Sequence, residues 1–543
     1  MENQWNTPEE EAQFYKEAYE QEKARAASLS GRLADAKNEA DNLQFQLDRI
    51  KNNPVWKASK PLRAGMHWGL RNYRRVRNLG GPRDIARKLR QKKMEQEAKK
   101  LHGTASFPTP EEAKKQQETK FERMVKISIL VPLYNTPMNF LNEMIDSVRN
   151  QTYQNWELCL ADGSDAEHAE VGVRCKEYAA EDNRIVYHKL EKNEGIAGNT
   201  NQCYKLATGE YIGLFDHDDV LHPSVLYEYV KVINEQNADY IYCDETTFKG
   251  DSIDNMITLH FKPDYSIDNL RANNYICHFL VMKRELLEKI GGFRSAYDGA
   301  QDFDLVLRLT EEAKRVIHIP KILYHWRSHE ASTAANPMSK LYAYEAGRRA
   351  VEDHLKRCEE PGVVTDTRFY GFYQTNYDIS KEMSVNLVLY SCKGKNPKKI
   401  LNNFSRNLHR QKVGNVIYYD NGFNKFVIFP QNKKIDGEVL IFAEAGISSM
   451  SENGLMQLAA NCYREGIGMA GGRILSGKGE LLYGRMEPDE NGVLEHADAG
   501  LPRGFTGYFH KAILQQNTEG VSHRLFAVRR ELFEEWKPEG EYS

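Results

Sequence analysis

An α/β fold, in which a mostly parallel sheet carries helices on both faces, is predicted for the central part of this 543-residue chain. First, short apolar runs alternate with longer amphipathic segments from about residue 125 onward. Second, acidic and aromatic side chains follow the ends of several of these runs, where ligand-binding residues lie in such sheets. Third, a similar succession of runs begins again at residue 385, which predicts a second domain.

The composition excludes several classes of protein. About three or four units are expected, because the chain is too long for one hydrophobic core. With 28% charged residues and a formal net charge of -3, the whole chain has no general attraction to nucleic acid. Its eight cysteines include no close C-x-x-C pair, which favours reduced thiols in the cytosol over a zinc site. Without a visible secretory signal or an apolar run of about 18 residues, we expect a cytoplasmic protein that does not span a membrane.

Residues 1–55 are expected to be helical. Between Leu29 and Ile50, apolar residues recur at alternating steps of four and three, the spacing of a short coiled coil. Gly31 weakens that interpretation. Two alternatives therefore stay open, namely self-association through this helix and the packing of a single solvated helix on its own protein.

Residues 56–100 concentrate lysine and arginine and interleave them with Trp56, Trp68 and other apolar side chains. This composition favours a helix on an anionic membrane surface, which predicts a peripheral protein on the inner face of the cell membrane. A merely solvated basic face would look the same. Nucleic-acid binding lacks any fold signature in the sequence, so no such partner is expected. Residues 101–124, with two prolines, are expected to be a linker.

Residues 125–357 are expected to form one domain of alternating strands and helices. Strands are predicted where apolar runs are short, at 125–134, 156–163, 210–219 and 238–245. Helices are predicted where apolar residues recur every three or four positions, at 139–151, 169–182 and 223–236. Tyr134, Asp162 and Asp216 then fall at or beyond strand ends, where ligand chemistry is expected.

Three carboxylates, those of Asp216, Asp218 and Asp219, follow one apolar run together. Like charges this close repel each other unless a cation compensates them. A divalent ion such as Mg²⁺ or Mn²⁺, shared between carboxylates and diphosphate oxygens, would meet that need. The alternative is an acidic turn that caps the next helix.

The motifs that follow one another between Val125 and Arg357 are SILVPLYN, LADGSD, NEGIAGNTNQ, GLFDHDD, GGF, YDGAQDFDLVLRL and YHWRSHEAST. This series resembles family 2 of the glycosyltransferases, and within it the bacterial enzymes of rhamnan and O-antigen type that assemble cell-surface polysaccharides. The resemblance implies the GT-A fold, a single nucleotide-diphospho-sugar transferase domain of the α/β class. It also implies a nucleotide-sugar donor.

The resemblance assigns to the donor a set of seven residues, Pro132, Tyr134, Asp162, Asn193, Gly195, Asp216 and Arg327. Asp162 would accept a hydrogen bond from the base, and Ala161 stands where many relatives carry a further aspartate. Asn193 and Gly195 would approach the ribose and phosphates, and Arg327 would contribute phosphate charge. For Gly195, an ordinary turn residue is an open alternative.

For the cation, expected to be Mn²⁺ or Mg²⁺, the resemblance implies direct ligation by Asp218, with Asp216 in contact with the ribose or the metal shell. Asp219 would help to position the metal or the acceptor. A histidine of LYHWRSHEAST would be a further ligand, with His329 the first candidate and His325 the second.

Asp302, in the motif YDGAQDFDL, matches the catalytic base of the family and would deprotonate the acceptor hydroxyl for an inverting attack. Gln301 precedes it where the family commonly has glutamate, so one charge is missing beside the base. The alternative is that Asp302 or Asp304 only caps the following helix. His278 is expected to be a hydrogen-bonded core histidine.

Residues 385–543, after an expected connector at 358–384, resemble a second, incomplete GT-A-like domain. Strands are predicted at SVNLVLYS, GNVIYYDNG and GEVLIFAEAGI, and AVRRELFEEW is similar to VMKRELLEKI of the first domain. Aligning Phe442 with Phe215 puts AEAG in the place of the acids DHDD, so the metal carboxylates are missing. We expect this domain to dock an acceptor, a partner or a membrane instead of catalysing.

The sequence therefore predicts an inverting, metal-dependent glycosyltransferase with a UDP- or dTDP-type donor. Its acceptor would be a glycan or a lipid-linked molecule in cell-surface polysaccharide synthesis. The alternative is a non-catalytic scaffold that organises other glycosyltransferases at the membrane. The presence of Asp216, Asp218 and Asp302 in one domain favours the enzyme.

Overall fold

The structure is a computed structural model that describes residues 103–329, 341–378, 383–390, 413–419, 426–429, 437–451, 453–488, 491–504 and 506–536. The described residues all belong to one compact unit, 93–543. The predicted N-terminal helix and the basic segment 56–100 lie outside them. Within the described residues, no helix is both long and apolar enough to cross a membrane.

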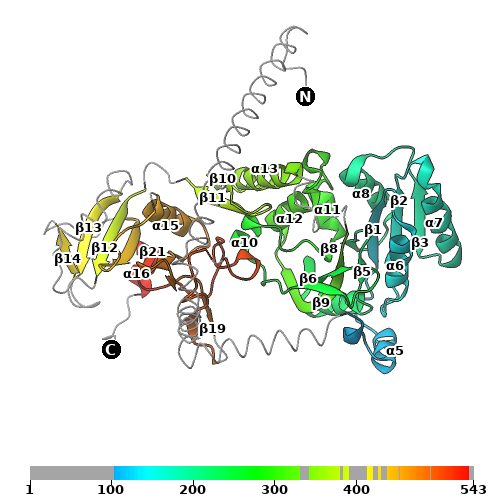
Figure 1. The fold of residues 1–543 in the computed structure, drawn as a ribbon, viewed down its shortest axis with the longest axis horizontal. Helices are drawn as coiled ribbons and strands as arrows, with labels where there is room; N and C mark the ends of the chain where they lie inside the picture. Colours follow the sequence, from blue (N-terminus) through cyan, green and yellow to red (C-terminus); the bar gives the residue numbers. More distant parts are fainter. Residues whose placement is uncertain are drawn as a thin grey trace, which may run out of the picture. The chain divides into compact units, whose positions relative to one another are not determined.

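The first sheet has nine strands in the order β3-β2-β1-β4-β8-β6-β9-β5, with β7 paired to β6 (Figure 1). Their bounds are β1 Ile127–Leu133, β2 Trp156–Asp162, β3 Ile185–Lys189, β4 Tyr211–Leu214, β5 Val220–Leu221, β6 Tyr240–Lys249, β7 Met256–His260, β8 Leu280–Lys283 and β9 Val316–Ser328. Strands β1 to β4 are parallel, and so are β6 and β9. The α/β class is confirmed, but the sheet is mixed instead of mostly parallel, because β8 enters between β4 and β6 in the reverse direction.

Helices cover both faces of this sheet, as predicted (Figure 1). One apolar core joins Ile127, Ile129 and Val131 of β1 to helices α6 (Met138–Arg149), α7 (Ala169–Glu181) and α9 (Val225–Gln236). The other joins Leu130 of the same strand to α8 (Gly195–Leu206), α11 (Arg284–Ile290), α12 (Gln301–Glu312) and α13 (Leu341–Arg357). Neighbouring residues of β1 face opposite cores because side chains alternate along a strand.

The segment expected to be a linker is structured in its described part, which corrects that expectation. It contains a 3-10 turn, η1 (Gly103–Ser106), and the helix α5 (Pro110–Glu118). Thr109 and Glu112 close a capping box at the start of α5. Pro110 occupies the first helical position, where a missing N–H breaks no hydrogen bond, so this proline marks a helix start.

The second sheet has six described strands in the order β14-β13-β12-β15-β21-β16. Their bounds are β12 Val385–Tyr390, β13 Val413–Tyr419, β14 Phe426–Phe429, β15 Val439–Glu444, β16 Met469–Gly471 and β21 Leu525–Arg529. The series β13-β12-β15-β21 repeats the order and directions of β2-β1-β4-β8. Helix α16 (Arg530–Trp536) follows β21 as α11 follows β8. The described residues therefore contain part of a second copy of the first fold.

Shorter elements connect and extend the two sheets. The expected connector contains a hairpin of β10 (Gly362–Asp366) and β11 (Tyr373–Tyr377). Helix α10 (Ile267–Ala272) precedes β8, and α15 (Gly454–Tyr463) belongs to the second domain. The remaining elements are η2 (Ala166–His168), η3 (Ser295–Tyr297), β17 (Ile474–Leu475), β18 (Leu481–Tyr483), β19 (Met486–Pro488), β20 (Leu494–His496) and η6 (Tyr508–His510).

Candidate functional site

The candidate site lies at one edge of the first sheet. Strands β1, β2 and β4 are parallel, so their carboxyl ends meet there, with Leu133 opposite Asp162 and Leu130 opposite Leu214. Tyr134 comes directly after β1 and is 47% exposed. Asp216 lies two residues beyond the end of β4. Pro132 is part of β1 itself, opposite Ala161. These residues occupy the edge at which the sequence placed them.

Asp162, the residue expected to contact the donor base, is buried at the end of β2. Its Oδ1 accepts a hydrogen bond from the backbone N of Ser164 at 2.8 Å, and its Oδ2 accepts one from the Tyr187 hydroxyl at 2.8 Å. Lys189 Nζ lies 3.4 Å from the same Oδ2. Burial and the neighbouring carboxylate raise the pKa of Tyr187. Tyr187 and Lys189 are neighbours of this carboxylate that no motif in the sequence marks.

Gly195 begins α8 with a φ of +77°, a conformation that residues with a side chain rarely adopt. A Cβ built there would lie 2.7 Å from Asp298 Oδ2. Asn193 Oδ1 accepts hydrogen bonds from the backbone N of Gly195 at 3.0 Å and from Asn199 Nδ2 at 2.9 Å. The geometry therefore supports the turn alternative for Gly195, and Asn193 fixes the same turn.

His329 lies close to Asp218 in the loop of residues 216–219, which follows β4 and is here called the acid loop. His329 Nε2 lies 2.7 Å from Asp218 Oδ2, although 111 residues separate them in the chain. Burial opposes ionisation of Asp218, but the hydrogen bond from His329 and the charge of His217 lower the pKa of Asp218 below its ordinary value. The structure thus brings together the two side chains that the sequence placed first among the metal ligands.

Asp219 is an internal anchor, and its expected role in positioning the metal or the acceptor stays a prediction, because its carboxylate also lies near Asp216 and His278. Its Oδ1 accepts a hydrogen bond from the backbone N of Arg327 at 2.7 Å, and its Oδ2 accepts one from the Tyr324 hydroxyl. The residue is fully buried, and burial raises the pKa of its carboxyl group well above the ordinary value. Asp219 therefore fixes the acid loop to β9.

Arg327 supports the acid loop from inside, which corrects the expectation that it contacts donor phosphates. Its Nε donates to the backbone O of Asp218 at 2.6 Å, and its Nη1 donates to the backbone O of Gly250 at 2.7 Å. Its Nη2 pairs with Glu143. The rings of Phe140 and Phe248 each lie 4.5 Å from the guanidinium carbon. The side chain of Arg327 is only 1% exposed, so its guanidinium contacts groups of the protein itself.

His325, the second candidate for a metal ligand, lies inside the protein. Its Nδ1 is 2.9 Å from Thr246 Oγ1, and the ring packs beside Phe107 and His222. His325 belongs to β9, whereas His329 lies just beyond the end of that strand. The expectation for His325 is therefore corrected, and His329 is the histidine beside the acids.

His278 lies between the acid loop and a buried charge cluster instead of in the apolar core. Its Nε2 is 3.4 Å from Asp216 Oδ2 and its Nδ1 is 3.2 Å from Glu245 Oε2. The ring stacks on Tyr324 with centroids 4.7 Å apart. Lys262 Nζ approaches Glu245 Oε2 at 2.9 Å from a side chain without exposed surface. The expectation of a core histidine is right about its hydrogen bonding and wrong about its place.

Asp302 lies in the first turn of α12, close to the same cluster. Its Oδ2 accepts a hydrogen bond from Asn274 Nδ2 at 2.8 Å, and the Cys277 thiol lies 3.6 Å from this oxygen. Burial raises the pKa of Asp302. The N-cap of α12 is Ala300, and Gln301 uses its side chain to accept a hydrogen bond from Gly299 N at 2.9 Å. Asp302 is therefore not the N-cap residue of α12, although it is one of two acidic residues in the first turn of that helix.

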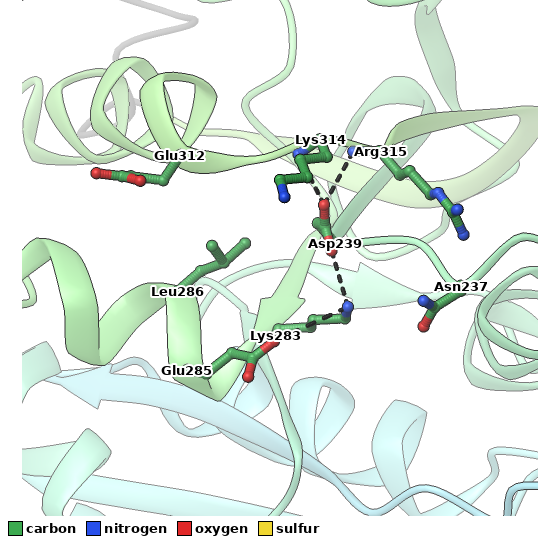
Figure 2. Close-up of a pocket in the computed structure, with 8 residues that line it drawn as sticks. All are labelled: Asn237, Asp239, Lys283, Glu285, Leu286, Glu312, Lys314 and Arg315. Carbon is green, nitrogen blue, oxygen red and sulfur yellow. Dashed lines mark hydrogen bonds and ion pairs between the residues drawn. The ribbon is translucent and has the colours of Figure 1, made fainter.

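A pocket on the first domain lies away from these residues (Figure 2). It is lined by Asn237, Asp239, Lys283, Glu285, Leu286, Glu312, Lys314 and Arg315. Asn237 and Asp239 precede β6, and Lys314 and Arg315 precede β9, so the pocket lies at the amino ends of these strands, opposite the edge that carries the acids. Asp239 already binds Lys283 Nζ at 2.8 Å and the backbone N of Lys314 at 2.7 Å. The pocket has no link to the candidate chemistry.

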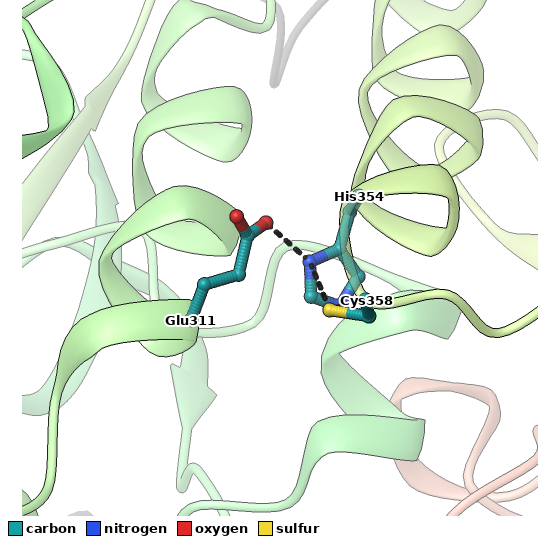
Figure 3. Close-up of side chains that lie close together, drawn as sticks. All are labelled: Glu311, His354 and Cys358. Carbon is teal, nitrogen blue, oxygen red and sulfur yellow. Dashed lines mark hydrogen bonds and ion pairs between the residues drawn. The ribbon is translucent and has the colours of Figure 1, made fainter.

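A second cluster, formed by Glu311, His354 and Cys358, has side chains of metal-binding type (Figure 3). His354 Nδ1 lies 2.7 Å from Glu311 Oε1, and Arg271 Nη2 lies 3.1 Å from His354 Nε2. Arg357 also binds Glu311, at 2.7 Å. Two guanidinium groups beside these three side chains disfavour a cation, so the cluster is structural.

Comparisons with known proteins identify the family. Residues 128–291 match the family model described as glycosyl transferase family 2. The Bacillus subtilis protein EpsE, named as a glycosyltransferase, is 31% identical over 243 residues, which cover 41% of this chain and 82% of EpsE. The chain belongs to glycosyl transferase family 2.

Other relatives of this family 2 chain are longer than it is. An uncharacterized protein of Sinorhizobium fredii is 32% identical over 445 residues, which cover 75% of this chain and 48% of that protein. The O-antigen biosynthesis protein RfbC of Myxococcus xanthus is 27% identical over 460 residues, which cover 79% of this chain and 36% of RfbC. The family 2 chain thus spans half or less of the length of these two relatives.

The family match and the site overlap only in part. The matched range 128–291 includes the acid loop and Asn274 but ends before Asp302 and His329. The second domain of this family 2 chain has no acid loop, since Glu444 pairs with Arg524 and its neighbours are alanine and glycine. Among the described residues, the acid loop therefore occurs only in the first domain.

Proposed function

We propose that this family 2 chain is an inverting glycosyltransferase that moves a sugar from a UDP- or dTDP-type donor to a glycan or lipid-linked acceptor. The observation that carries the proposal is the contact of Asp218 with His329, together with Asp216 beside His278 and Asp302 beside Cys277, the residue before His278. A relative named for O-antigen biosynthesis supports cell-surface polysaccharide as the product class.

The residues beside the acid loop fit a divalent cation. Asp218 and His329 present a carboxylate oxygen and an imidazole nitrogen 2.7 Å apart, and the carboxylate of Asp216 is 46% exposed beside them. Oxygen ligands suit Mg²⁺ and Mn²⁺, and a nitrogen ligand is better tolerated by Mn²⁺. When bound, such an ion would neutralise charge on the departing diphosphate. Asp218 and His329 would hold it, and Asp216 would complete its shell or contact the ribose.

Asp302 would act as the base. Its carboxylate takes the proton of the acceptor hydroxyl while the acceptor oxygen forms a bond to the anomeric carbon. The bond between that carbon and the donor diphosphate breaks on the opposite side, so the configuration inverts. Burial raises the pKa of Asp302, which makes it a stronger base than an exposed aspartate.

The donor nucleotide would lie along the ends of β1 and β2. Tyr134 offers an exposed aromatic surface there, and Pro132 and Asp162 border it. Asn193 and Gly195 would contribute by fixing the turn at the start of α8. We also propose that the basic segment 56–100 attaches the protein to an anionic membrane surface, where a lipid-linked acceptor would be found.

The experiment that tests the function is a screen for nucleotide release from UDP- and dTDP-sugars by the full chain. Release that requires Mn²⁺ or Mg²⁺ and stops with a chelator is the expected result. Transfer to glycan primers is then followed by mass spectrometry. A chain that releases no nucleotide from any donor, with either ion and with primers present, would favour the scaffold instead.

A further inference from the structure

Residues 266–278 join the second domain to the candidate base. They begin at Ser266, run through the short helix α10 and end at His278, which lies beside Asp216. A helix of six residues is too short to be stable by itself. Contacts from the rest of the protein must therefore hold it.

The second domain holds the start of α10. Asn517 Oδ1 accepts hydrogen bonds from Ser266 Oγ at 2.8 Å and from the backbone N of Asp268 at 3.2 Å. The backbone N of Asn517 in turn donates to Ser266 Oγ at 3.3 Å. Ser266 is the N-cap residue of α10 but makes no capping bond of its own. Asn517, from the second domain, supplies that bond across 249 residues.

An ion-pair network holds the same helix by its side chains. Arg464 Nη1 lies 2.6 Å from Asp268 Oδ1, and Arg464 Nε lies 2.6 Å from Glu360 Oε2. Arg271, also of α10, binds both oxygens of Glu360 at 2.8 and 2.9 Å. The guanidinium of Arg464 stacks over the ring of Tyr377. Arg464 and Asp268 are each 8% exposed in their side chains, so water screens this pair weakly.

The last part of segment 266–278 contacts Asp302. Asn274 Nδ2 donates to Asp302 Oδ2, and Asn274 Oδ1 accepts a hydrogen bond from the backbone N of Cys277 at 3.4 Å. Cys277 has a φ of +33°, which is uncommon for a residue with a side chain. Such a backbone persists only where the surroundings impose it. The position of α10 thus bears on how Asn274 meets Asp302.

We propose that the second domain positions the candidate base by clamping α10 through Arg464 and Asn517. Through this clamp the second domain, which has no acid loop, would contribute to the reaction of the first domain. This inference rests on the proposed function, because it concerns the base of that reaction. Arg464 and Asn517 are positioning residues, since they touch α10 and not the reacting groups.

The test uses two single variants of the full chain, Arg464→Gln and Asn517→Ala. Arg485→Gln is the matched control, because Arg485 forms a partly buried ion pair with Asp498 inside the second domain. Amide hydrogen exchange is followed in peptides that cover 266–278, and nucleotide release is measured under steady-state conditions. We expect faster exchange in this segment and a fall in kcat of about tenfold with little change in donor KM, because a misplaced base weakens the reaction step more than binding.

The outcomes separate the inference from the proposed function. Exchange and kcat that match the Arg485→Gln control would overturn the clamp, as would faster exchange with an unchanged kcat. If Arg464→Gln does not fold, Asn517→Ala decides, because it removes only the cap of α10. A wild-type chain without turnover would contradict the proposed function, while unchanged exchange at 266–278 in the variants would still overturn the clamp without any substrate.

Discussion

His329 Nε2 lies 2.7 Å from Asp218 Oδ2, which joins the end of β9 to the acid loop after β4. The two residues follow separate strands, β4 and β9, and neither belongs to the apolar cores. A carboxylate and an imidazole therefore lie side by side, and this combination suits a transition-metal cation.

Removing either side chain of this pair should weaken metal use. For His329→Ala, we expect the Mn²⁺ concentration that gives half-maximal nucleotide release to rise about tenfold or more. Asp218→Ala should abolish metal-dependent release while the protein stays folded by circular dichroism. His523→Ala, at an exposed histidine of the second domain, is the control. Unchanged metal dependence in both site variants would remove the pair from the metal site.

Asp302→Asn should keep donor binding and lose transfer. The amide keeps the shape of the side chain but cannot accept the acceptor proton, so we expect kcat to fall about 10²-fold or more. Donor binding is measured by calorimetry and transfer by product release. Glu312→Gln, at the far end of the same helix, is the control. A variant that transfers sugar at the normal rate would show that Asp302 is not the base.

The pH dependence of turnover should report the burial of Asp302. A general base acts in its ionised form, and burial raises the pKa of Asp302 above the ordinary 3.8. Activity should therefore fall as the pH drops through this raised value. Asn274→Ala removes a hydrogen-bond donor that favours the carboxylate, so the acid limb of the profile should move to higher pH. An acid limb that stays in place, compared with the exposed control Asn183→Ala, would contradict the assignment.

Lys262→Met should destabilise the first domain. The change removes the cation beside Glu245, and unpairing a buried charge typically costs about 3 kcal/mol, measured by urea unfolding. Burial opposes ionisation of Glu245, but Lys262 and His260 lower its pKa well below the ordinary 4.5. This stabilisation is present above pH 4.5 and is lost as the pH falls through the lowered value. Lys114→Met, at an exposed pair, should change little, and equal effects would refute the burial argument.

The sequence predicts the framework well where periodicity is strong. In α6, Leu141, Met144, Ile145 and Val148 recur at helical spacing, and all four are buried in one core. The residues at the ends of β1, β2 and β4 could also be placed, because parallel strands bring their carboxyl ends together. These features depend on short stretches of sequence.

Features that depend on distant contacts could not be predicted in the same way. Arg327 has the chemistry of a phosphate ligand, and only the folded chain reveals that its guanidinium packs over the rings of Phe140 and Phe248. Asn274 carries no charge, so nothing local marks it as a partner of Asp302. The clamp on α10 joins residues that are 249 positions apart, beyond the reach of any motif.

The packing of Arg327 has a consequence for ligand entropy. Its guanidinium binds the backbone of Asp218, and its backbone N binds Asp219, so the acid loop is tied down at two successive residues. Ordering a backbone residue costs roughly 1–2 kcal/mol, and here that ordering accompanies folding instead of ligand arrival. If Asp218 holds a cation as proposed, that ion would meet a carboxylate on an ordered backbone. A rigid site would discriminate between ions by radius and would disfavour Ca²⁺, with bonds of about 2.3–2.6 Å, relative to the smaller Mg²⁺.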